Sequence, residues 1–97
     1  MTIDPEDIMQ RITIIDRSGL TTRDVRILYS ISAFPGESGS DIVTRLELHS
    51  RSSVQGNLPK LIKYGMIIDT RLREGQAIPS KYYITPKGDE FLKRIVV

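Results

Sequence analysis

Residues 50–65 read SRSSVQGNLPKLIKYG, and their apolar side chains recur at helical spacing. Val54, Leu58 and Leu61 fall at i, i+4 and i+7, which is the period of one buried helix face. Ser50 is a good N-cap residue, and Gly65 is well placed to end the helix. The segment therefore predicts a helix whose opposite face is polar and basic.

A shorter helix is predicted just upstream, after a polar turn. Three apolar residues share one of its faces: Ile42, Val43 and Leu46. Ser40 can cap this helix, and the residues at 48–49 interrupt the apolar pattern before the next helix begins. Two helices on either side of a short corner form a helix-turn-helix unit, which we place at residues 40–64. Many all-helical domains contain such a corner, so the pattern alone is weak evidence of function.

From residue 66 the apolar period changes from helical to alternating, which is typical of a β-strand. The alternation sets Ile68, Thr70 and Leu72 against Ile67, Asp69 and Arg71. A turn at 73–76 leads to a second strand at 77–84, where Pro79 belongs at an edge or near the hairpin tip. Residues 66–85 therefore predict a β-hairpin wing.

Further helices are predicted on both sides of this unit. Asp4 as N-cap and Pro5 at the first helical position begin a helix at residues 4–16. A second helix begins at Thr21 or Thr22 and ends before Phe34, with one side formed by Val25, Leu28, Tyr29 and Ser32. The last helix, at residues 86–95, is capped by Thr85 and turns inward Phe91, Leu92 and Ile95.

Length and composition bound the fold class. A chain of 97 residues can form only one hydrophobic core, so residues 1–97 are predicted to be a single domain. Apolar residues at 39% and charged residues at 27% are ordinary for a globular protein. The prediction is an α+β, mainly helical fold: a winged helix-turn-helix with a two- to three-stranded β-wing and flanking N- and C-terminal helices.

The sequence lacks cysteine, which excludes disulfides and thiolate metal sites and fits a reducing compartment. No apolar run approaches the roughly 20 residues that a membrane helix needs, and the first residues are acidic, unlike a signal peptide. We therefore expect a cytoplasmic protein with no membrane partner.

Charge is distributed unevenly along the chain. Residues 1–50 carry five arginines against eight acids, whereas residues 51–97 carry nine basic residues against four acids. Charge clustered on one surface favours a polyanionic partner for the second half of the chain. An unevenly charged but merely solvated surface explains the same counts.

The outward side of the residue 50–63 segment is small, polar and basic. The candidate DNA contacts there are Ser50, Arg51, Ser52, Ser53, Gln55, Gly56, Asn57, Lys60 and Lys63. Arg51 and Gln55 are long enough to reach bases in the major groove, and Lys60 and Lys63 suit phosphates. The solvated face of an amphipathic helix is the alternative, but no acid lies between Ser50 and Gly65.

Pro59 lies inside this predicted helix, where its ring removes one hydrogen bond and clashes with the preceding turn. We therefore expect the helix to be kinked or divided between Gly56 and Pro59, which affects the register of the contact residues.

The predicted wing adds a second basic element. Its candidate DNA contacts are Arg71, Arg73, Gln76 and Lys81, beside a hairpin tip that contains Gly75. Such a hairpin can reach the minor groove or the DNA backbone next to the residue 50–63 helix. Charge that protects an edge strand from aggregation is the alternative explanation.

Three segments resemble the MarR and PadR-like winged-helix regulators: Leu48–Val54, Leu58–Ile67 and Tyr82–Gly88. They correspond to a serine-rich recognition helix, its leucine-rich second half and the closing threonine-x-x-glycine. The resemblance covers about residues 22–92 and implies that residues 50–60 enter the major groove, that residues 71–81 form the wing, and that the protein is a homodimer. Long MarR proteins carry a C-terminal dimerisation helix, so this chain is more similar to short single-domain regulators.

A dimer without that helix needs another surface. The candidate interface is an apolar stripe with Met9 beside it, made of Ile8, Ile12, Ile15 and Ile95. Packing of the same stripe inside one chain is an equal alternative.

No enzyme is predicted, because His49 lies in the helix-turn-helix corner and no catalytic triad, phosphate-binding glycine loop or metal spacing is evident. No cofactor, no metal and no particular small-molecule effector is indicated. The residues predict a sequence-specific DNA-binding transcription regulator that acts as a repressor; the alternative is a winged-helix protein–protein interaction module in a larger assembly. A small, polar and basic face favours DNA over a protein partner.

Overall fold

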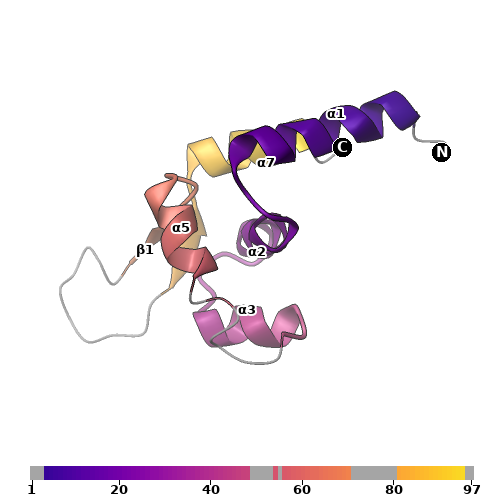
Figure 1. The fold of residues 1–97 in the computed structure, drawn as a ribbon. Helices are drawn as coiled ribbons and strands as arrows, with labels where there is room; N and C mark the ends of the chain where they lie inside the picture. Colours follow the sequence, from indigo (N-terminus) through magenta and orange to yellow (C-terminus); the bar gives the residue numbers. More distant parts are fainter. Residues whose placement is uncertain (1–3, 49–53, 55, 71–80, 96–97) are drawn as a thin grey trace.

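The computed structural model describes residues 4–48, 54, 56–70 and 81–95. Its elements are α1 (Pro5–Ser18), α2 (Thr22–Ala33), α3 (Gly39–Arg45), α5 (Asn57–Lys63), β1 (Ile67–Asp69), β2 (Tyr82–Ile84) and α7 (Pro86–Ile95) (Figure 1). The chain is mainly helical with a small antiparallel sheet, so the predicted winged-helix fold is confirmed. No helix among the described residues is long and apolar enough to cross a membrane.

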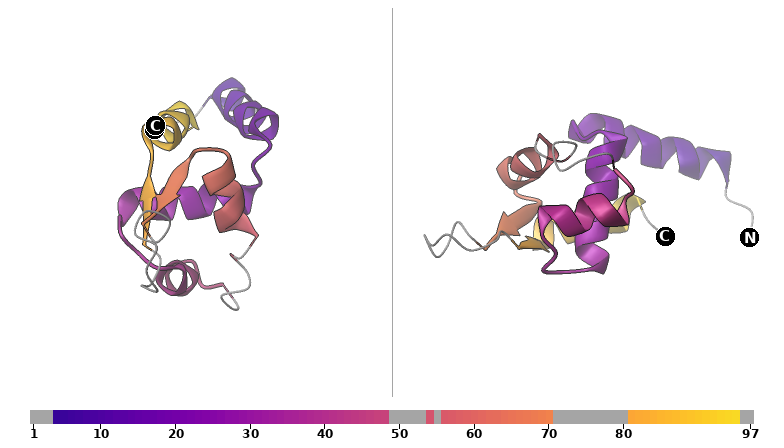
Figure 2. Two further views of the ribbon diagram at one scale, coloured as in Figure 1. Left: turned by 90° about the vertical axis from the view of Figure 1, so that its left-hand side faces the viewer. Right: turned by 90° about the horizontal axis from the view of Figure 1, so that it is seen from below.

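Helix α2 runs through the middle of the molecule. Ile27, Leu28 and Ile31 are completely buried on it, and the helix contacts α3, α5, α7 and β2. The long helix α1 lies beside α7 on one side of α2, and α3 lies on the opposite side (Figure 2). The core therefore surrounds α2. Leu28 is buried on this helix as the sequence predicts, but the centre of the buried face is shifted from the predicted one. The sequence predicts Tyr29 on that face, but its side chain is 53% exposed, because the helix turns its Ile27–Ile31 side inward.

The predicted N-caps of three helices are present. The carboxylate of Asp4 accepts the Glu6 N–H at the start of α1, and Thr21 forms a capping box with Asp24 at the start of α2. Thr85 Oγ1 accepts the Gly88 N–H in the first turn of α7 at 3.1 Å. These short-range signals place the helix starts correctly because each depends only on residues two or three positions apart.

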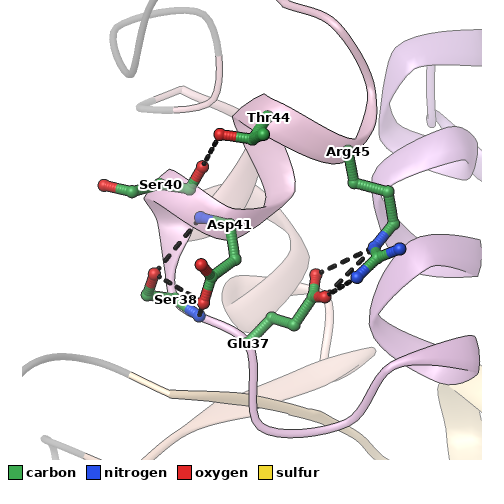
Figure 3. A network of polar contacts seen from close by, with 6 residues as sticks. All are labelled: Glu37, Ser38, Ser40, Asp41, Thr44 and Arg45. Carbon is green, nitrogen blue, oxygen red and sulfur yellow. Dashed lines mark hydrogen bonds and ion pairs between the residues drawn. The ribbon is translucent and has the colours of Figure 1, made fainter.

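The predicted cap of α3 is wrong. Ser38, not Ser40, is the N-cap, and the carboxylate of Asp41 accepts the Ser38 N–H in a reciprocal capping box. Ser40 lies inside the helix, where its carbonyl accepts the Thr44 hydroxyl (Figure 3). The reason is the position of Asp41, which lies three residues after Ser38 and so completes the box only from there.

Strands β1 and β2 pair antiparallel, with Ile67 opposite Ile84 and Asp69 opposite Tyr82. Ile67 is buried and Ile68 is exposed, so the alternation predicted from the sequence is confirmed here. A third segment joins the sheet as a single bridge, because the Tyr82 N–H donates to the Glu37 carbonyl at 3.1 Å. The predicted wing thus has a two-stranded base with one added bridge, and its residues 71–80 lie outside the described residues.

The junction between the sheet and α7 is closely packed. Thr85 Oγ1 donates to the Gly65 carbonyl, which joins the end of α5 to the beginning of α7. Gly88 packs against the strands with no room for a side chain, since a Cβ there would lie 2.3 Å from the Met66 carbonyl oxygen. The closing threonine-x-x-glycine of the sequence is therefore a helix cap followed by a close helix–strand contact.

Candidate nucleic-acid interface

Helix α5 and the residues just before it present two different faces. Val54, Leu58 and Leu61 are buried, as the sequence predicts, and they anchor this part of the chain on the core. Gly56, Pro59 and Lys63 are exposed on the outside. The projection made from the sequence therefore holds for these positions, and the exposed side carries a glycine, a proline and a cation.

Pro59 has a simple place in this helix. Helix α5 begins at Asn57, with Gly56 at the N-cap position and no side-chain cap, so Pro59 is in the first turn. The N–H groups of a first turn have no partner within the helix, and a proline there removes no hydrogen bond. The expected interruption between Gly56 and Pro59 thus corresponds to the beginning of α5.

Two of the predicted contacts, Asn57 and Lys60, turn toward α2 and bind Asp24. Asn57 Nδ2 donates to Asp24 Oδ1 at 2.6 Å, and Lys60 Nζ lies 2.8 Å from Asp24 Oδ2. The side chain of Asp24 is fully buried, whereas that of Lys60 retains 30% exposure. Lys60, which the sequence predicts to contact a phosphate, therefore has an alternative partner within its own chain, the carboxylate of Asp24.

Burial by itself would raise the pKa of Asp24, because a charged carboxylate loses its water. The hydrogen bonds from Lys60, from the Thr21 N–H and from Asn57 outweigh this effect, so the pKa of Asp24 lies below its ordinary value. Asp24 is thus a buried carboxylate that stays ionised at neutral pH.

From the sequence, Asp24 is expected only as an acid in the first turn of α2, where the helix dipole favours a negative charge. Its contact with Lys60 spans 36 residues of chain, and no local pattern indicates it. The helical phase gives a signal once the buried side of α2 is known, because Asp24 lies three residues before Ile27 on that side. A buried acid requires a partner, which points to the cations of a neighbouring helix.

The rest of the predicted interface is only partly described. Lys81 is exposed beside β2, at the base of the wing, and its carbonyl accepts the Thr70 N–H at 3.1 Å. The other predicted contacts lie outside the described residues and remain predictions: Ser50, Arg51, Ser52, Ser53, Gln55, Arg71, Arg73 and Gln76.

A second basic side chain, that of Arg45, also binds a carboxylate of its own chain. Arg45, at the end of α3, forms an ion pair with Glu37 (Figure 3). Its guanidinium carbon also lies 3.4 Å from the centroid of the Phe34 ring. The hydrogen bonds to Glu37 raise the pKa of Arg45. Because the backbone of Glu37 bridges to Tyr82, this pair connects α3 to the base of the wing.

Helix α1 has an exposed apolar face. Ile8, Met9 and Ile12 are 42%, 62% and 53% exposed. Ile15 is partly buried against the core, and Ile95 belongs to the core itself. The interface expected from the sequence is therefore corrected at Ile95, which packs within one chain, while Met9 extends the exposed part of the stripe.

Comparison with known proteins finds no matching family profile and no matching curated protein. Solved structures do match. A multiple antibiotic-resistance repressor (MarR) from Listeria monocytogenes is 25% identical, with a TM-score of 0.70 over 90% of this chain and 61% of that one. The transcriptional repressor CouR, solved with a 23-mer DNA duplex, is 22% identical with a TM-score of 0.72 over 93% of this chain and 62% of its own.

A further structure described as MarR is 18% identical, with a TM-score of 0.73 over 99% of this chain and 73% of its own. The chain thus has the winged-helix fold of MarR-family transcription regulators, as the resemblance of its motifs implied. It spans about three fifths of the length of the first two of these relatives. The Listeria protein and CouR are both described as repressors and not as enzymes.

Proposed function

We propose that this chain, which has the winged-helix fold of MarR-family regulators, is a transcription regulator that binds double-stranded DNA. The observation that carries the proposal is the α5 region, because it combines a buried apolar anchor with an exposed side free of acids. The sequence from Ser50 to Gly65 contains no acid, and Lys63 is exposed in the last turn of α5. CouR, a protein of the same fold, is described as bound to a DNA duplex.

In the proposed complex the segment from Ser50 to Lys63 lies in the major groove, which is wide enough to admit a helix. Exposed small residues such as Gly56 let the backbone approach the duplex closely, and Lys63 neutralises a phosphate. Lys81 and the wing contact the backbone or the adjacent minor groove. Base recognition belongs to Arg51 and Gln55 in this proposal.

We further propose that the protein acts as a homodimer and as a repressor. The apolar face of α1, formed by Ile8, Met9 and Ile12, is exposed in a single chain and suits a second copy. Acids lie near the beginning of α1 and Arg17 lies in its last turn. Two copies of α1 packed antiparallel would bring these opposite charges together.

The direct test is titration of the protein with mixed-sequence duplexes at low ionic strength, followed by selection of preferred sites from random duplexes. We expect association that weakens steeply with added salt and a recovered site with two half-sites. A protein that associates with no duplex under these conditions contradicts the proposal and favours the alternative of a protein–protein interaction module.

A matched pair of lysine variants separates a DNA surface from general basicity. Lys63→Ala, on the exposed side of α5, should make the fall of log affinity with log salt less steep by about 0.9, the value for one phosphate contact. Lys93→Ala removes an equal charge on α7, where Lys93 pairs with Asp89, and should leave the slope unchanged. Equal effects of both substitutions would show that the interface is elsewhere.

A further inference from the structure

Asp24 connects the beginning of α2 to the outer helix of the proposed DNA-binding unit. Its two carboxylate oxygens accept hydrogen bonds from Asn57, from Lys60 and from the Thr21 N–H. Asn57 and Lys60 lie three residues apart, so both point from the same side of α5 toward α2. The polar ends of two residues that the sequence predicts to contact DNA are therefore already occupied.

A fully buried carboxylate holds such partners strongly. In a weakly polarisable interior, removing one partner of an ion pair leaves an uncompensated charge, which is far less favourable than the intact pair. If Lys60 moved to a phosphate, Asp24 would remain at 0% exposure without its cation. Lys60 is therefore better placed on Asp24 than on DNA, even when DNA is bound.

We propose that Asp24 is a positioning residue for DNA recognition: it holds Asn57 and Lys60 against α2, so that Lys60 orients α5 instead of neutralising a phosphate. This inference rests on the proposed DNA binding and deepens it, because it divides the cations of α5 into two roles. Lys63 contacts the duplex, and Lys60 determines the angle at which the helix presents its exposed side.

Lys60 and Lys63 form a natural comparison, since they carry the same charge on one helix and only Lys60 binds Asp24. Lys63→Met should reduce the steepness of the salt dependence by about 0.9 and weaken binding to all sequences alike. Lys60→Met should leave the salt slope at the wild-type value. It should instead reduce the preference for a selected site over a mixed duplex by about tenfold, as the loss of one good base contact would.

Asp24→Asn makes the opposite change, because it preserves the shape of the side chain but releases the cation. The freed Lys60 can then reach a phosphate, so the salt slope should become steeper by about 0.9 while the preference for the selected site falls. A merely structural role would lower the folded fraction, change both affinities by one factor and leave the slope unchanged. Adding Lys60→Met to Asp24→Asn should return the slope to the wild-type value.

The outcomes separate the two proposals. If the wild-type protein binds no duplex, the proposed function fails, and this inference fails with it. If the wild-type protein binds and Lys60→Met reduces the steepness of the salt dependence as much as Lys63→Met does, Lys60 is a phosphate contact. The positioning role is then overturned while DNA binding stands. Circular dichroism shows whether each variant is folded. If Asp24→Asn is not, the comparison of Lys60→Met with Lys63→Met decides; if Lys60→Met is not, the salt dependence of Asp24→Asn with and without added Lys60→Met decides.

Discussion

Replacing Gly88 by alanine tests the contact that joins α7 to the sheet. A Cβ at this position would lie 2.3 Å from the Met66 carbonyl oxygen and 2.8 Å from Ile84 Cγ1. The Ile84 side chain can rotate away, but the Met66 carbonyl is backbone and its oxygen already accepts the Thr85 N–H at 3.0 Å. Relief therefore requires α7 to move relative to β1, which also strains the Thr85 cap.

The expected magnitude follows from two opposing effects. Alanine is favoured over glycine within a helix by about 1 kcal/mol, whereas overpacking a tight site costs about 1–3 kcal/mol and more when backbone must move. The backbone clash outweighs the helix preference at Gly88, so we expect a net loss of about 2 kcal/mol in the free energy of unfolding. For a domain of this size that corresponds to a fall in Tm of about 8–16 °C.

The assay is thermal and urea unfolding followed by circular dichroism, with Gly56→Ala as the matched control. A Cβ added at Gly56 would have no neighbouring atom among the described residues within 4 Å. The free energy of unfolding of Gly56→Ala should therefore equal that of the wild type or be slightly higher. If Gly88→Ala unfolds at the same temperature and urea concentration as Gly56→Ala, the close approach of α7 to the Met66 carbonyl is wrong.

Three further predictions concern charge and association. Because the pKa of Asp24 is lowered in the folded state, its contribution to stability is complete above the unfolded value near 3.8 and is lost as pH falls through the folded value. Urea unfolding should therefore show a difference between wild type and Asp24→Asn at pH 7 that shrinks in acid; a difference independent of pH contradicts the ionised pair. Ile12→Asp should yield monomers in sedimentation experiments, whereas Gln10→Asp, about 160° around α1, should remain dimeric; unchanged mass of a folded Ile12→Asp excludes this face. Lys63→Ala should reduce the salt dependence of DNA binding and Lys93→Ala should not, as measured by fluorescence anisotropy over a range of salt concentrations.

Local sequence signals predict most of the fold because they act over a few residues. Asp4, Thr21 and Thr85 each cap a helix through a neighbour two or three positions away. The sequence predicts the cap of α3 at Ser40 although it lies at Ser38, because two nearby serines can both cap a helix and the position of Asp41 decides between them. Helical period alone cannot decide which side of α2 is buried, since Tyr29 gives an apolar pattern as good as that of Ile31.

The candidate site is predictable in part, because some of its signals also act over a few residues. Apolar spacing predicts which side of α5 is buried, and the remaining side is then the exposed one. The contact of Lys60 with Asp24 joins segments 36 residues apart, so it depends on how α2 and α5 pack. A lysine on a polar helix face looks the same in the sequence whether it meets solvent, phosphate or a buried acid.

The shortness of α5 makes this packing decisive. A helix of seven residues is not stable by itself in water, so its direction depends on what holds its two ends. Asp24 binds Asn57 at the first residue of α5 and Lys60 at its middle, and Thr85 binds the Gly65 carbonyl just after the end. Asp24→Asn releases Lys60 from the first attachment, and Gly88→Ala disturbs the second. Since the proposed contacts at Ser50–Gly56 precede α5, Asp24→Asn should reduce sequence preference more than Gly88→Ala does, when both are compared at temperatures where each variant is fully folded.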